Sequence, residues 1–526
     1  MLVFLALIWR LPFEGHFFYG LEYEDSYIYS VAGRYLSAGD YLCNPPNSCY
    51  LTTVCAVGNL NACEKTETFS GHFIGYPFMI AVASRVLGYS PTIGSYLSLF
   101  SSLMAVVFIF LVCEFIDPNS IIGLAGAMVF CVTPVFAVFG VGTYAEPVSD
   151  ALVVMSLFLG MHLLEPDPEE SSVSVFVNWI ALTFIALFAL LVKRENLLLI
   201  PILVLAGLWI NVGNKRFGGN GRWPRYAMSV ISVLLCIGFA ITKLHFMRVV
   251  ESETVEFGLF PFSWSFLRTM FPLFAKSYLS LTWYVGGGIF VLLGIVASLR
   301  SRNRSMYVTG LFVAFLLLYA SHVRSYYQLK IGDVTQFDTL RYSMNLAGLW
   351  SILAGLGFSW FISLLRDLRF PTVIAKQSKV ILWFWVAAYV LTSWVLGNRL
   401  KEDMVEQEYA VRIKPASSAL QFVSAGPSNT FVITLEPLII QMLARDPVNV
   451  IDLNYISAGL VNDLSSRCPN IRLLYIEESI YLSKANRERY REAFDFLGSI
   501  NKSLLYRGHN YAVYLLTVPS QTKMPK

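Results

Sequence analysis

Apolar stretches long enough to cross a lipid bilayer recur along most of the chain. A helix needs about 20 predominantly apolar residues to span the hydrocarbon core. An apolar N-terminal stretch, Met1 to Trp9, is the first candidate, and with the later ones it brings the predicted number of spans to about eleven. The pattern predicts a mainly α, polytopic membrane protein. The later predicted spans lie at about residues 94–114, 121–141, 147–164, 175–192, 196–213, 226–246, 278–299, 305–321, 342–365 and 379–397.

The segment 14–92 separates the first predicted span from the second and is polar to amphipathic. Within it, Ser26–Leu36 and Phe73–Leu87 are predicted helices, and the second of them is partly apolar. We expect this second helix to lie along the membrane interface rather than to cross. The segment is therefore predicted to be a long outer loop with interfacial helices, inside a transmembrane domain of residues 1–398.

After Asn398 the apolar runs shorten and alternate with polar helices. Three short apolar runs predict buried strands, two amphipathic stretches predict helices, and a terminal hairpin is expected. The C-terminal part, residues 399–526, is therefore predicted to be a small soluble α/β domain. The predicted strands are Phe431–Leu435, Val448–Leu453 and Ile471–Ile476; the helices are Pro437–Arg445 and Asn486–Leu497; the hairpin is Ser503–Thr517.

The composition agrees with a membrane protein. The chain is 56% hydrophobic and 14% charged, whereas soluble globular proteins carry about 25% charged residues. This composition excludes a soluble globular protein. The net charge of +4 comes from basic residues in the loops, so it reports topology and gives no sign of nucleic-acid binding.

The positions of the basic residues predict the sidedness of the loops. Alternation of the predicted spans puts three basic loops, at 215–225, 300–304 and 366–379, on one face. Loops rich in Lys and Arg stay cytoplasmic, so the segment 14–92 and the C-terminal domain are predicted to lie outside. We expect a multi-pass protein of a bacterial or archaeal plasma membrane, or an equivalent membrane. Its active site and C-terminal domain would be extracytoplasmic.

Four of the eight cysteines fall in the predicted outer loop: Cys43, Cys49, Cys55 and Cys63. They form no CxxC pair and have no flanking histidine at the spacing of a zinc site. Disulfides persist in an oxidising compartment such as the extracytoplasmic space. Two disulfides are therefore favoured over a metal site, and the sequence leaves their pairing open.

Ionisable residues at the outer ends of the spans are the candidate site residues, because charges at membrane depth are costly. Glu24 and Asp25 follow the first span, where adjacent acids are also common in the first turn of a helix. Glu146 opens the 147–164 span, and the Pro147 that follows fits an N-terminal helix residue equally well. Each acid therefore has a structural interpretation beside the functional one.

Lys193, Arg194 and Glu195 interrupt a stretch that is otherwise apolar. A charge triple between two spans is usually a solvated turn. This triple, however, lies on the predicted outer face, where positive charge is disfavoured. That placement favours an anionic ligand, and arginine binds phosphate with a bidentate fork. Arg324 and Arg341 have the same interpretation.

Taken in order, these segments resemble the GT-C superfamily of membrane glycosyltransferases, especially the branch of the protein O-mannosyltransferases and the lipid A aminoarabinose transferase. The family's acidic pair after the first helix is matched by Glu24-Asp-Ser-Tyr-Ile-Tyr-Ser-Val-Ala-Gly-Arg-Tyr. Its basic residue with prolines before an interfacial helix is matched by His72-Phe-Ile-Gly-Tyr-Pro. The chain departs from the family in having Glu24 for the usual Asp, and His72 without a double proline. Later matches are Glu146 in the second outer loop, Arg194-Glu195 at a later span and Arg341-Tyr342 at a late one.

The resemblance implies an inverting glycosyltransferase that moves a sugar from a polyprenyl-phosphate donor to a hydroxyl of a lipid, glycan or protein acceptor. Asp25 or Glu24 would deprotonate the acceptor, with an oxocarbenium-like transition state. Lys193, Arg194 and Arg341 would neutralise the departing phosphate. The implied catalytic residues are Asp25, Glu24 and Glu146, and the implied substrate-binding residues are His72, Lys193, Arg194, Glu195, Arg324, Arg341 and Tyr342.

No metal is strictly required by such a reaction, because a polyprenyl monophosphate is already a competent leaving group. The oligosaccharyltransferase branch of the family uses a divalent ion, and Glu24, Asp25 and Glu146 would supply carboxylate ligands to one. The alternative function is a transporter or flippase of lipid-linked anions. Transporters often show internal repeats and helices broken near the midplane, but the sequence has no repeat and its charges lie near the outer surface. The Gly286-Gly287-Gly288 run is the one feature that favours this alternative, and it also fits close helix packing.

Overall fold

The chain divides into two compact units, which we treat separately. The first unit comprises Met1–Phe17, Phe73–Tyr76 and Ser95–Lys401. The second comprises Phe18–His72, Pro77–Gly94 and Glu402–Lys526. The computed structural model describes the chain except residues 18–23, 39–73, 119–120, 166–170, 214–221, 251–263, 280–283, 302, 322–343, 368–377, 401–412, 425–429, 436, 445–448, 454–455, 468–470, 479–487, 489, 509–510 and 518–526.

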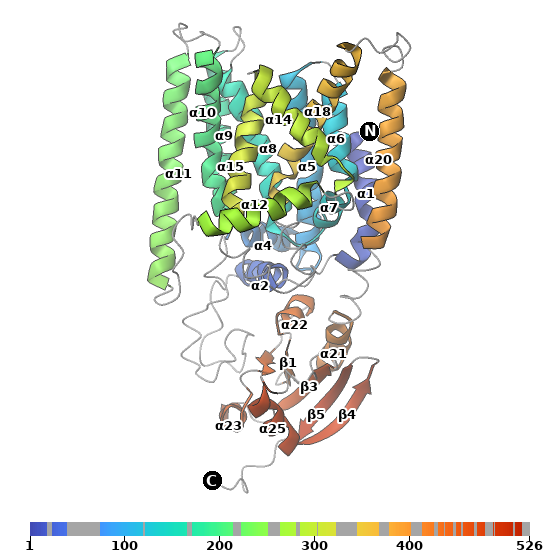
Figure 1. Ribbon diagram of the computed structural model, residues 1–526. Helices are drawn as coiled ribbons and strands as arrows, with labels where there is room; N and C mark the ends of the chain where they lie inside the picture. Colours follow the sequence, from blue (N-terminus) through green and yellow to red (C-terminus); the bar gives the residue numbers. More distant parts are fainter. Residues whose placement is uncertain are drawn as a thin grey trace. The chain divides into compact units, whose positions relative to one another are not determined.

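The first unit is a bundle of helices (Figure 1). Most of its helices run along a common direction, and α12 runs across it (Figure 1). Its elements are α1 (Leu2–Phe17), α5 (Ile93–Ile116), α6 (Ile121–Val132), α7 (Pro134–Phe139), α8 (Ala145–Leu164), α9 (Ser172–Val192), η2 (Arg194–Leu198), α10 (Leu199–Gly213), α11 (Arg222–Val250), α12 (Trp264–Tyr278), α14 (Gly288–Ser301), α15 (Ser305–Ala320), η3 (Met344–Leu346), α18 (Ala347–Asp367) and α20 (Ser378–Leu400).

Five helices among the described residues are long and apolar enough to cross a membrane. They are α5, α8, α9, the Arg225–Thr242 part of α11, and Met344–Leu364, which joins η3 to α18. Shorter apolar helices, between 10 and 17 residues long, occupy Leu2–Leu11, Gly75–Leu87, Ile122–Val132, Gly288–Ser301 and Ser305–Ala320. A polytopic helical architecture is therefore confirmed, whereas the number of about eleven spans stays a prediction.

Two predicted spans differ in detail from the helices observed. The span predicted at 121–141 is broken at Thr133, which has an extended backbone between α6 and α7. Pro134 explains the break, because proline has no N–H to continue the helical ladder. The span predicted at 278–299 is wrong at its start, since α14 begins only at Gly288, after Gly286 with a positive φ of 71°.

Glycines lie where two central helices of the first unit contact each other most closely. Helix α18 packs against α6 and α14. A methyl group at Gly357 would overlap the Phe290 carbonyl, and one at Gly294 would overlap the Leu353 carbonyl. Small residues let apolar helices approach backbone to backbone, which supplies the van der Waals contact that replaces the hydrophobic effect in lipid.

The second unit contains a five-stranded sheet with the order β2-β1-β3-β5-β4. Strands β2, β1 and β3 are parallel, and β5 and β4 form an antiparallel hairpin at one edge. The three strands, the first helix and the hairpin predicted from the sequence are confirmed in this region. The helix predicted at 486–497 is observed as Arg491–Ser499, with part of its predicted start outside the described residues, and α21 and α23 were not predicted. The elements are β1 (Thr430–Thr434), β2 (Asn449–Asp452), β3 (Arg472–Glu478), β4 (Asn501–Arg507) and β5 (Tyr511–Thr517), with helices α21 (Lys414–Ser424), α22 (Pro437–Leu443), α23 (Ala458–Arg467) and α25 (Arg491–Ser499).

Helices cover both faces of this sheet, which explains why β1 is apolar at nearly every position. Phe431 and Ile433 pack with α23 and α25 in one core, whereas Val432 packs with α21 and α22 in the other. Side chains alternate between faces along a strand, so a strand buried on both faces is a continuous apolar run.

Two N-terminal helices, α2 (Glu24–Ala38) and α4 (Gly75–Leu87), contribute to the second unit as well. Val31 of α2 is fully buried in the core that also contains α21 and α22. Gly33 lies against Ile80 so closely that a methyl group there would overlap this side chain. The predicted domains divide the chain at Asn398, but the compact unit formed by the C-terminal residues also includes helices from the segment 14–92.

Candidate functional site

The start of α8 places one predicted residue, Glu146, inside the first unit. Helix α8 begins at Ala145, and Glu146 lies in its first turn. Its side chain is fully buried. An acid that served only the helix dipole would sit at a solvated end, so burial of Glu146 calls for a specific partner.

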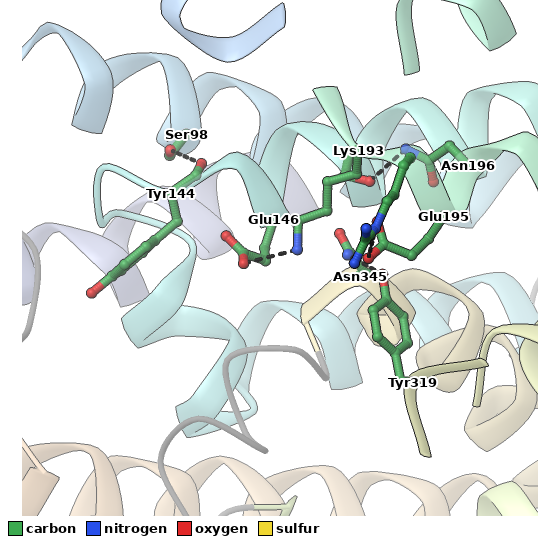
Figure 2. A network of polar contacts seen from close by, with 10 residues as sticks. Ser98, Tyr144, Glu146, Lys193, Glu195, Asn196, Tyr319 and Asn345 are labelled. Atoms are coloured by element: carbon green, nitrogen blue, oxygen red, sulfur yellow. Dashed lines mark hydrogen bonds and ion pairs between the residues drawn. The ribbon is translucent and has the colours of Figure 1, made fainter. Parts of the chain in front are cut away.

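Lys193 is that partner. Its Nζ donates a hydrogen bond to Glu146 Oε1 at 2.9 Å, and the two side chains point toward one another in Figure 2. Lys193 is the extended residue between α9 and η2, with φ −147° and ψ 132°. This backbone break ends α9 and turns the Lys193 side chain into the protein. The charge triple is therefore not a solvated turn: Lys193 and Glu195 are 8% and 7% exposed.

Asn196 fixes the turn that carries the charge triple. Its Nδ2 donates to the Ala189 carbonyl at 2.9 Å, within the last turn of α9. The same Nδ2 donates to Ser149 Oγ at 2.8 Å, on α8. Since Ser149 follows Glu146 by three residues on one helix face, the two contacts hold α8 and the α9–α10 connection in register.

Asn345 completes the network from the other side (Figure 2). It lies in η3, is buried, and contacts the Tyr319 hydroxyl of α15. The Asn345 amide makes the most hydrogen bonds when its oxygen faces Lys193 Nζ, at 3.2 Å. Its nitrogen then donates to Ser149 Oγ at 3.1 Å and to the Glu146 carbonyl at 3.2 Å. Four separate elements, α8, η2, α15 and η3, therefore meet at one polar cluster.

Asp150 is a further buried carboxylate one turn beyond Glu146. Its Oδ1 accepts a hydrogen bond from the Gly348 N–H at 2.9 Å, at the start of α18. This contact satisfies one of the backbone donors that a helix start leaves open. Oδ2 is buried and has no hydrogen-bond partner among the described residues.

Tyr76 and Gly75 border the same region. Tyr76 hydroxyl and Ser98 Oγ lie 2.9 Å apart, and Ser98 donates to the Tyr144 carbonyl at 3.2 Å, just before α8 (Figure 2). A methyl group at Gly75 would overlap the backbone of Leu191 and Val192, directly before Lys193. Part of the stretch predicted as a family motif, Gly-Tyr before Pro77, therefore packs beside the polar cluster.

The cluster mixes charges of both signs. Arg194 Nε lies 3.9 Å from Glu195 Oε1, at the limit of an ion pair, and the Arg194 side chain is 23% exposed. Arg194 is thus more open to solvent than Lys193, which is held among acceptors. Buried charges that are paired and hydrogen-bonded inside a membrane protein mark functional sites more often than ordinary packing does.

The predicted site residues fall into three groups. Glu146, Lys193, Arg194 and Glu195 lie in the cluster. Glu24 and Asp25 lie in the first turn of α2, in the second unit, and their side chains are outside the described residues. His72, Arg324, Arg341 and Tyr342 and the cysteines Cys43, Cys49, Cys55 and Cys63 are outside the described residues as well.

Five residues of the cluster were missed from the sequence: Ser149, Asp150, Asn196, Tyr319 and Asn345. Two of them carry a signal that periodicity reveals. In the sequence, Asp150 follows Glu146 by four residues and Asn196 follows Lys193 by three, which is the spacing of side chains on one helix face; the structure confirms a shared face only for Glu146 and Asp150 on α8, because Lys193 has an extended backbone. Polar side chains repeated on one face of an apolar helix indicate a polar interior partner.

A divalent ion does not find a ready ligand set in the described residues. No group of three His, Cys, Asp or Glu side chains among them is close enough to hold a metal ion. Glu146, the one predicted carboxylate ligand whose surroundings are described, is engaged by Lys193. Divalent ions need several oxygen ligands that converge on one point, and the described residues do not bring such a set together.

Comparison with known proteins gives the fold. No family model matches the chain, and no curated protein matches it. Several solved structures, in contrast, are similar to it. The aminoarabinose transferase ArnT from Cupriavidus metallidurans, bound to undecaprenyl phosphate, superposes with a TM-score of 0.60 at 10% identity, over 98% of this chain and 97% of that one.

A second solved protein has the same architecture. The oligosaccharyltransferase from Archaeoglobus fulgidus, tethered to an acceptor peptide, superposes with a TM-score of 0.56 at 10% identity, over 100% of this chain and 74% of that one. Both are members of the GT-C superfamily. The chain has the GT-C fold. The resemblance inferred from short motifs is thereby confirmed for the fold, and at this identity the likeness establishes architecture alone.

Proposed function

We propose that this GT-C protein is an integral membrane glycosyltransferase. It moves a sugar from a polyprenyl-phosphate donor to the hydroxyl of a lipid, glycan or protein acceptor, on the extracytoplasmic face of the membrane and with inversion. The observation that carries the proposal is the likeness over nearly the full length of both chains to ArnT, a structure that contains undecaprenyl phosphate. The polar cluster around Lys193 and Arg194, at the start of η2, is the local feature that suits such a donor, because it offers two cations to a phosphate.

In the proposed reaction, Asp25 or Glu24 accepts the proton of the acceptor hydroxyl. The acceptor oxygen then attacks the anomeric carbon from the face opposite to the phosphate. The bond between that carbon and the phosphate oxygen breaks, and its electron pair leaves with the polyprenyl phosphate. A positioned carboxylate base accelerates such a step by about 10²–10⁴-fold.

Lys193 and Arg194 would stabilise the negative charge that collects on the leaving phosphate. Such preorganised charge usually accelerates a reaction more than any other single effect. Glu146 and Asn345 orient Lys193 from fixed positions on α8 and η3, and this fixed orientation is what a preorganised site requires.

The alternative, a transporter of lipid-linked anions, would place its charges at a helix break near the midplane of the bilayer. The break at Lys193 follows the 21-residue helix α9. At a rise of 1.5 Å per residue, such a helix is about 32 Å long, which is enough to cross the hydrocarbon core. The break therefore comes at the end of a helix that is long enough to span, and not within one, which supports the transferase over the transporter.

The test is a transfer assay with purified protein in lipid nanodiscs. A panel of polyprenyl phosphates carrying different labelled sugars is offered together with lipid, glycan and peptide acceptors. We expect transfer from at least one donor, with release of polyprenyl phosphate and inversion at the anomeric carbon. Wild-type protein that transfers none of the sugars but moves lipid-linked sugars between the leaflets of vesicles would favour the transporter.

A double variant tests the base within the same assay. Asp25→Asn combined with Glu24→Gln keeps the side-chain shapes and removes both carboxylates. Transfer should fall by about 100-fold or more, which is the usual loss when general-base catalysis is removed. Folding is checked by thermal melting, and donor binding is measured separately. Transfer at the wild-type rate by the double variant would rule out these carboxylates as the base.

A further inference from the structure

Arg34 makes an unusual set of contacts within the second unit. It lies in α2 and is only 6% exposed. One nitrogen, Nη1, donates to the Gln441 carbonyl at 2.7 Å and to the Ala444 carbonyl at 2.9 Å. Its guanidinium also lies over the ring of Tyr89, 4.8 Å from the ring centre. Arg34 therefore connects an N-terminal helix to a segment more than four hundred residues later in the chain.

The carbonyls that Arg34 contacts are at the C-terminal end of α22. The last carbonyls of a helix have no partner within it and carry the negative end of the helix dipole. Arg34 satisfies two of these groups, and the Tyr89 hydroxyl donates to a third, the Met442 carbonyl, at 2.8 Å. The end of α22 is thus capped by a stacked arginine and tyrosine from outside the C-terminal domain.

Apolar packing supports the same attachment. Val31, one turn before Arg34 in α2, is fully buried together with Ile439 and Ile440 of α22. Charged hydrogen bonds and apolar burial therefore act on one face of α2. This face fixes both the position of α2 on α22 and its rotation about its own axis.

The first turn of α2 contains Glu24 and Asp25. Ten residues separate Glu24 from Arg34, which corresponds to about 15 Å along a helix. A tilt of only about 4° about the attachment point would move the first turn by about 1 Å over that length. Misplacement of a reacting group by about 1 Å can lower a rate about 100-fold.

We propose that Arg34 is a positioning residue, through which the C-terminal α/β domain holds the acidic start of α2 in its reactive place. This inference rests on the proposed function, because it takes Glu24 or Asp25 to be the base. It gives the C-terminal domain a part in the reaction although the domain itself supplies no reacting group. Tyr89 supports the same attachment by orienting the guanidinium.

The experiment compares variants of the full-length protein in the transfer assay. Arg34→Met keeps the length and apolar bulk of the side chain but removes its donors. We expect kcat to fall about 10-fold or more, while KM for the lipid donor stays within about 2-fold, because Lys193 and Arg194 are untouched. Arg34→Lys keeps a charged donor near the carbonyls and should restore kcat to within about 3-fold of wild type.

Arg85→Ala is the control. Arg85 also donates to a backbone carbonyl, that of Ser37 at 3.0 Å, but this bond is exposed and joins α4 to α2 rather than α2 to the C-terminal domain. Its loss should leave kcat within about 2-fold of wild type. Hydrogen exchange of the backbone amides of α2, measured on the same proteins, should rise in Arg34→Met and stay unchanged in Arg85→Ala.

Three results would overturn the inference while leaving the proposed function intact. One is an Arg34→Met protein that melts at a lower temperature but keeps the wild-type kcat per folded molecule. Another is a rise in donor KM with kcat unchanged, and the third is unaltered exchange in α2. Absence of sugar transfer by the wild-type protein would instead refute the proposed function. Hydrogen exchange of the α2 amides would still decide whether Arg34 holds α2 in place.

Discussion

Helix α8 has an ion pair at each end, and the two pairs differ in burial and in surroundings. At its start, Glu146 pairs with Lys193 at 2.9 Å, and the two side chains are 0% and 9% exposed. At its end, Glu165 pairs with Arg304 at 2.7 Å, and the side chains are 17% and 39% exposed. Similar distances thus occur in two very different environments.

The pair at the end of α8 has the features of a structural contact. Arg304 also donates to the Phe115 carbonyl in the last turn of α5, at 2.8 Å, and its guanidinium lies 4.1 Å from the centre of the Phe115 ring. A cation near the last carbonyls of a helix is stabilising. Arg304 therefore ties together the ends of α5 and α8 at the start of α15, where part of its charge stays in solvent.

The pair at the start of α8 costs more free energy to remove from water, because it is almost fully buried. Removing two charges from water is expensive, and a buried pair often stabilises a protein less than apolar residues of the same size would. Stability alone therefore gives little reason for Glu146 and Lys193 to be buried in a membrane bundle. Both residues also contact Asn345, as the proposed function requires if Lys193 is to present a fixed positive charge.

The largest expected effect is that of Lys193→Met. It leaves the Glu146 carboxylate buried without its cation, which typically destabilises a protein by about 3–5 kcal/mol. Transfer per folded molecule should fall by about 100-fold or more, because charge stabilisation of the leaving phosphate is lost. Denaturant unfolding and the transfer assay measure the two effects. Wild-type transfer by the folded fraction would show that this lysine does not act on the donor.

The double variant Lys193→Met with Glu146→Leu separates stability from function. Replacing both members of a buried pair with apolar residues is often neutral or stabilising, so the free energy of unfolding should return to within about 1 kcal/mol of wild type. Transfer should stay as low as in the single variant. Recovery of transfer together with stability would make the pair structural and contradict its place in the site.

An intermediate effect is expected for Asn345→Ala. The change removes the amide that contacts Lys193, Ser149 and Tyr319. Buried polar groups that lose a partner destabilise a protein by about 1–3 kcal/mol each time. Since the charge of Lys193 remains but its orientation is less fixed, kcat should fall about 10-fold with a smaller change in donor KM. An unchanged kcat would limit Asn345 to a packing role.

Much of this architecture could be predicted from the sequence. The apolar runs predicted a polytopic helical protein, and β1, β2 and β3 were placed to within two residues because buried parallel strands are short continuous apolar runs. The break at Thr133 was missed, since one proline in an apolar run can also be accommodated in a membrane helix. The start of α14 was missed because Gly286-Gly287-Gly288 is apolar by composition.

The site was only partly predictable. Glu146 and Lys193 were found because charges next to membrane spans are rare, but their pairing joins residues 47 positions apart. No periodicity within one helix contains such information. Asn345 and Tyr319 are neutral residues beside apolar helices, so only the tertiary contacts of η3 and α15 distinguish them from ordinary packing residues. The attachment of α2 to α22 is longer in range still, because Arg34 and Gln441 are 407 positions apart.

The smallest effect is expected at the other end of α8. Arg304→Met removes the ion pair with Glu165, but the Arg304 side chain is 39% exposed, so solvent screens much of the interaction. Partly exposed pairs contribute about 0–1 kcal/mol, and the lost bond to the Phe115 carbonyl adds about 1 kcal/mol. The melting temperature should therefore fall slightly, and the rate of sugar transfer should stay within about 2-fold of wild type. If Arg304→Met lowered transfer as strongly as Lys193→Met, burial would not distinguish the site from a structural pair, and the assignment of the site to the start of α8 would be wrong.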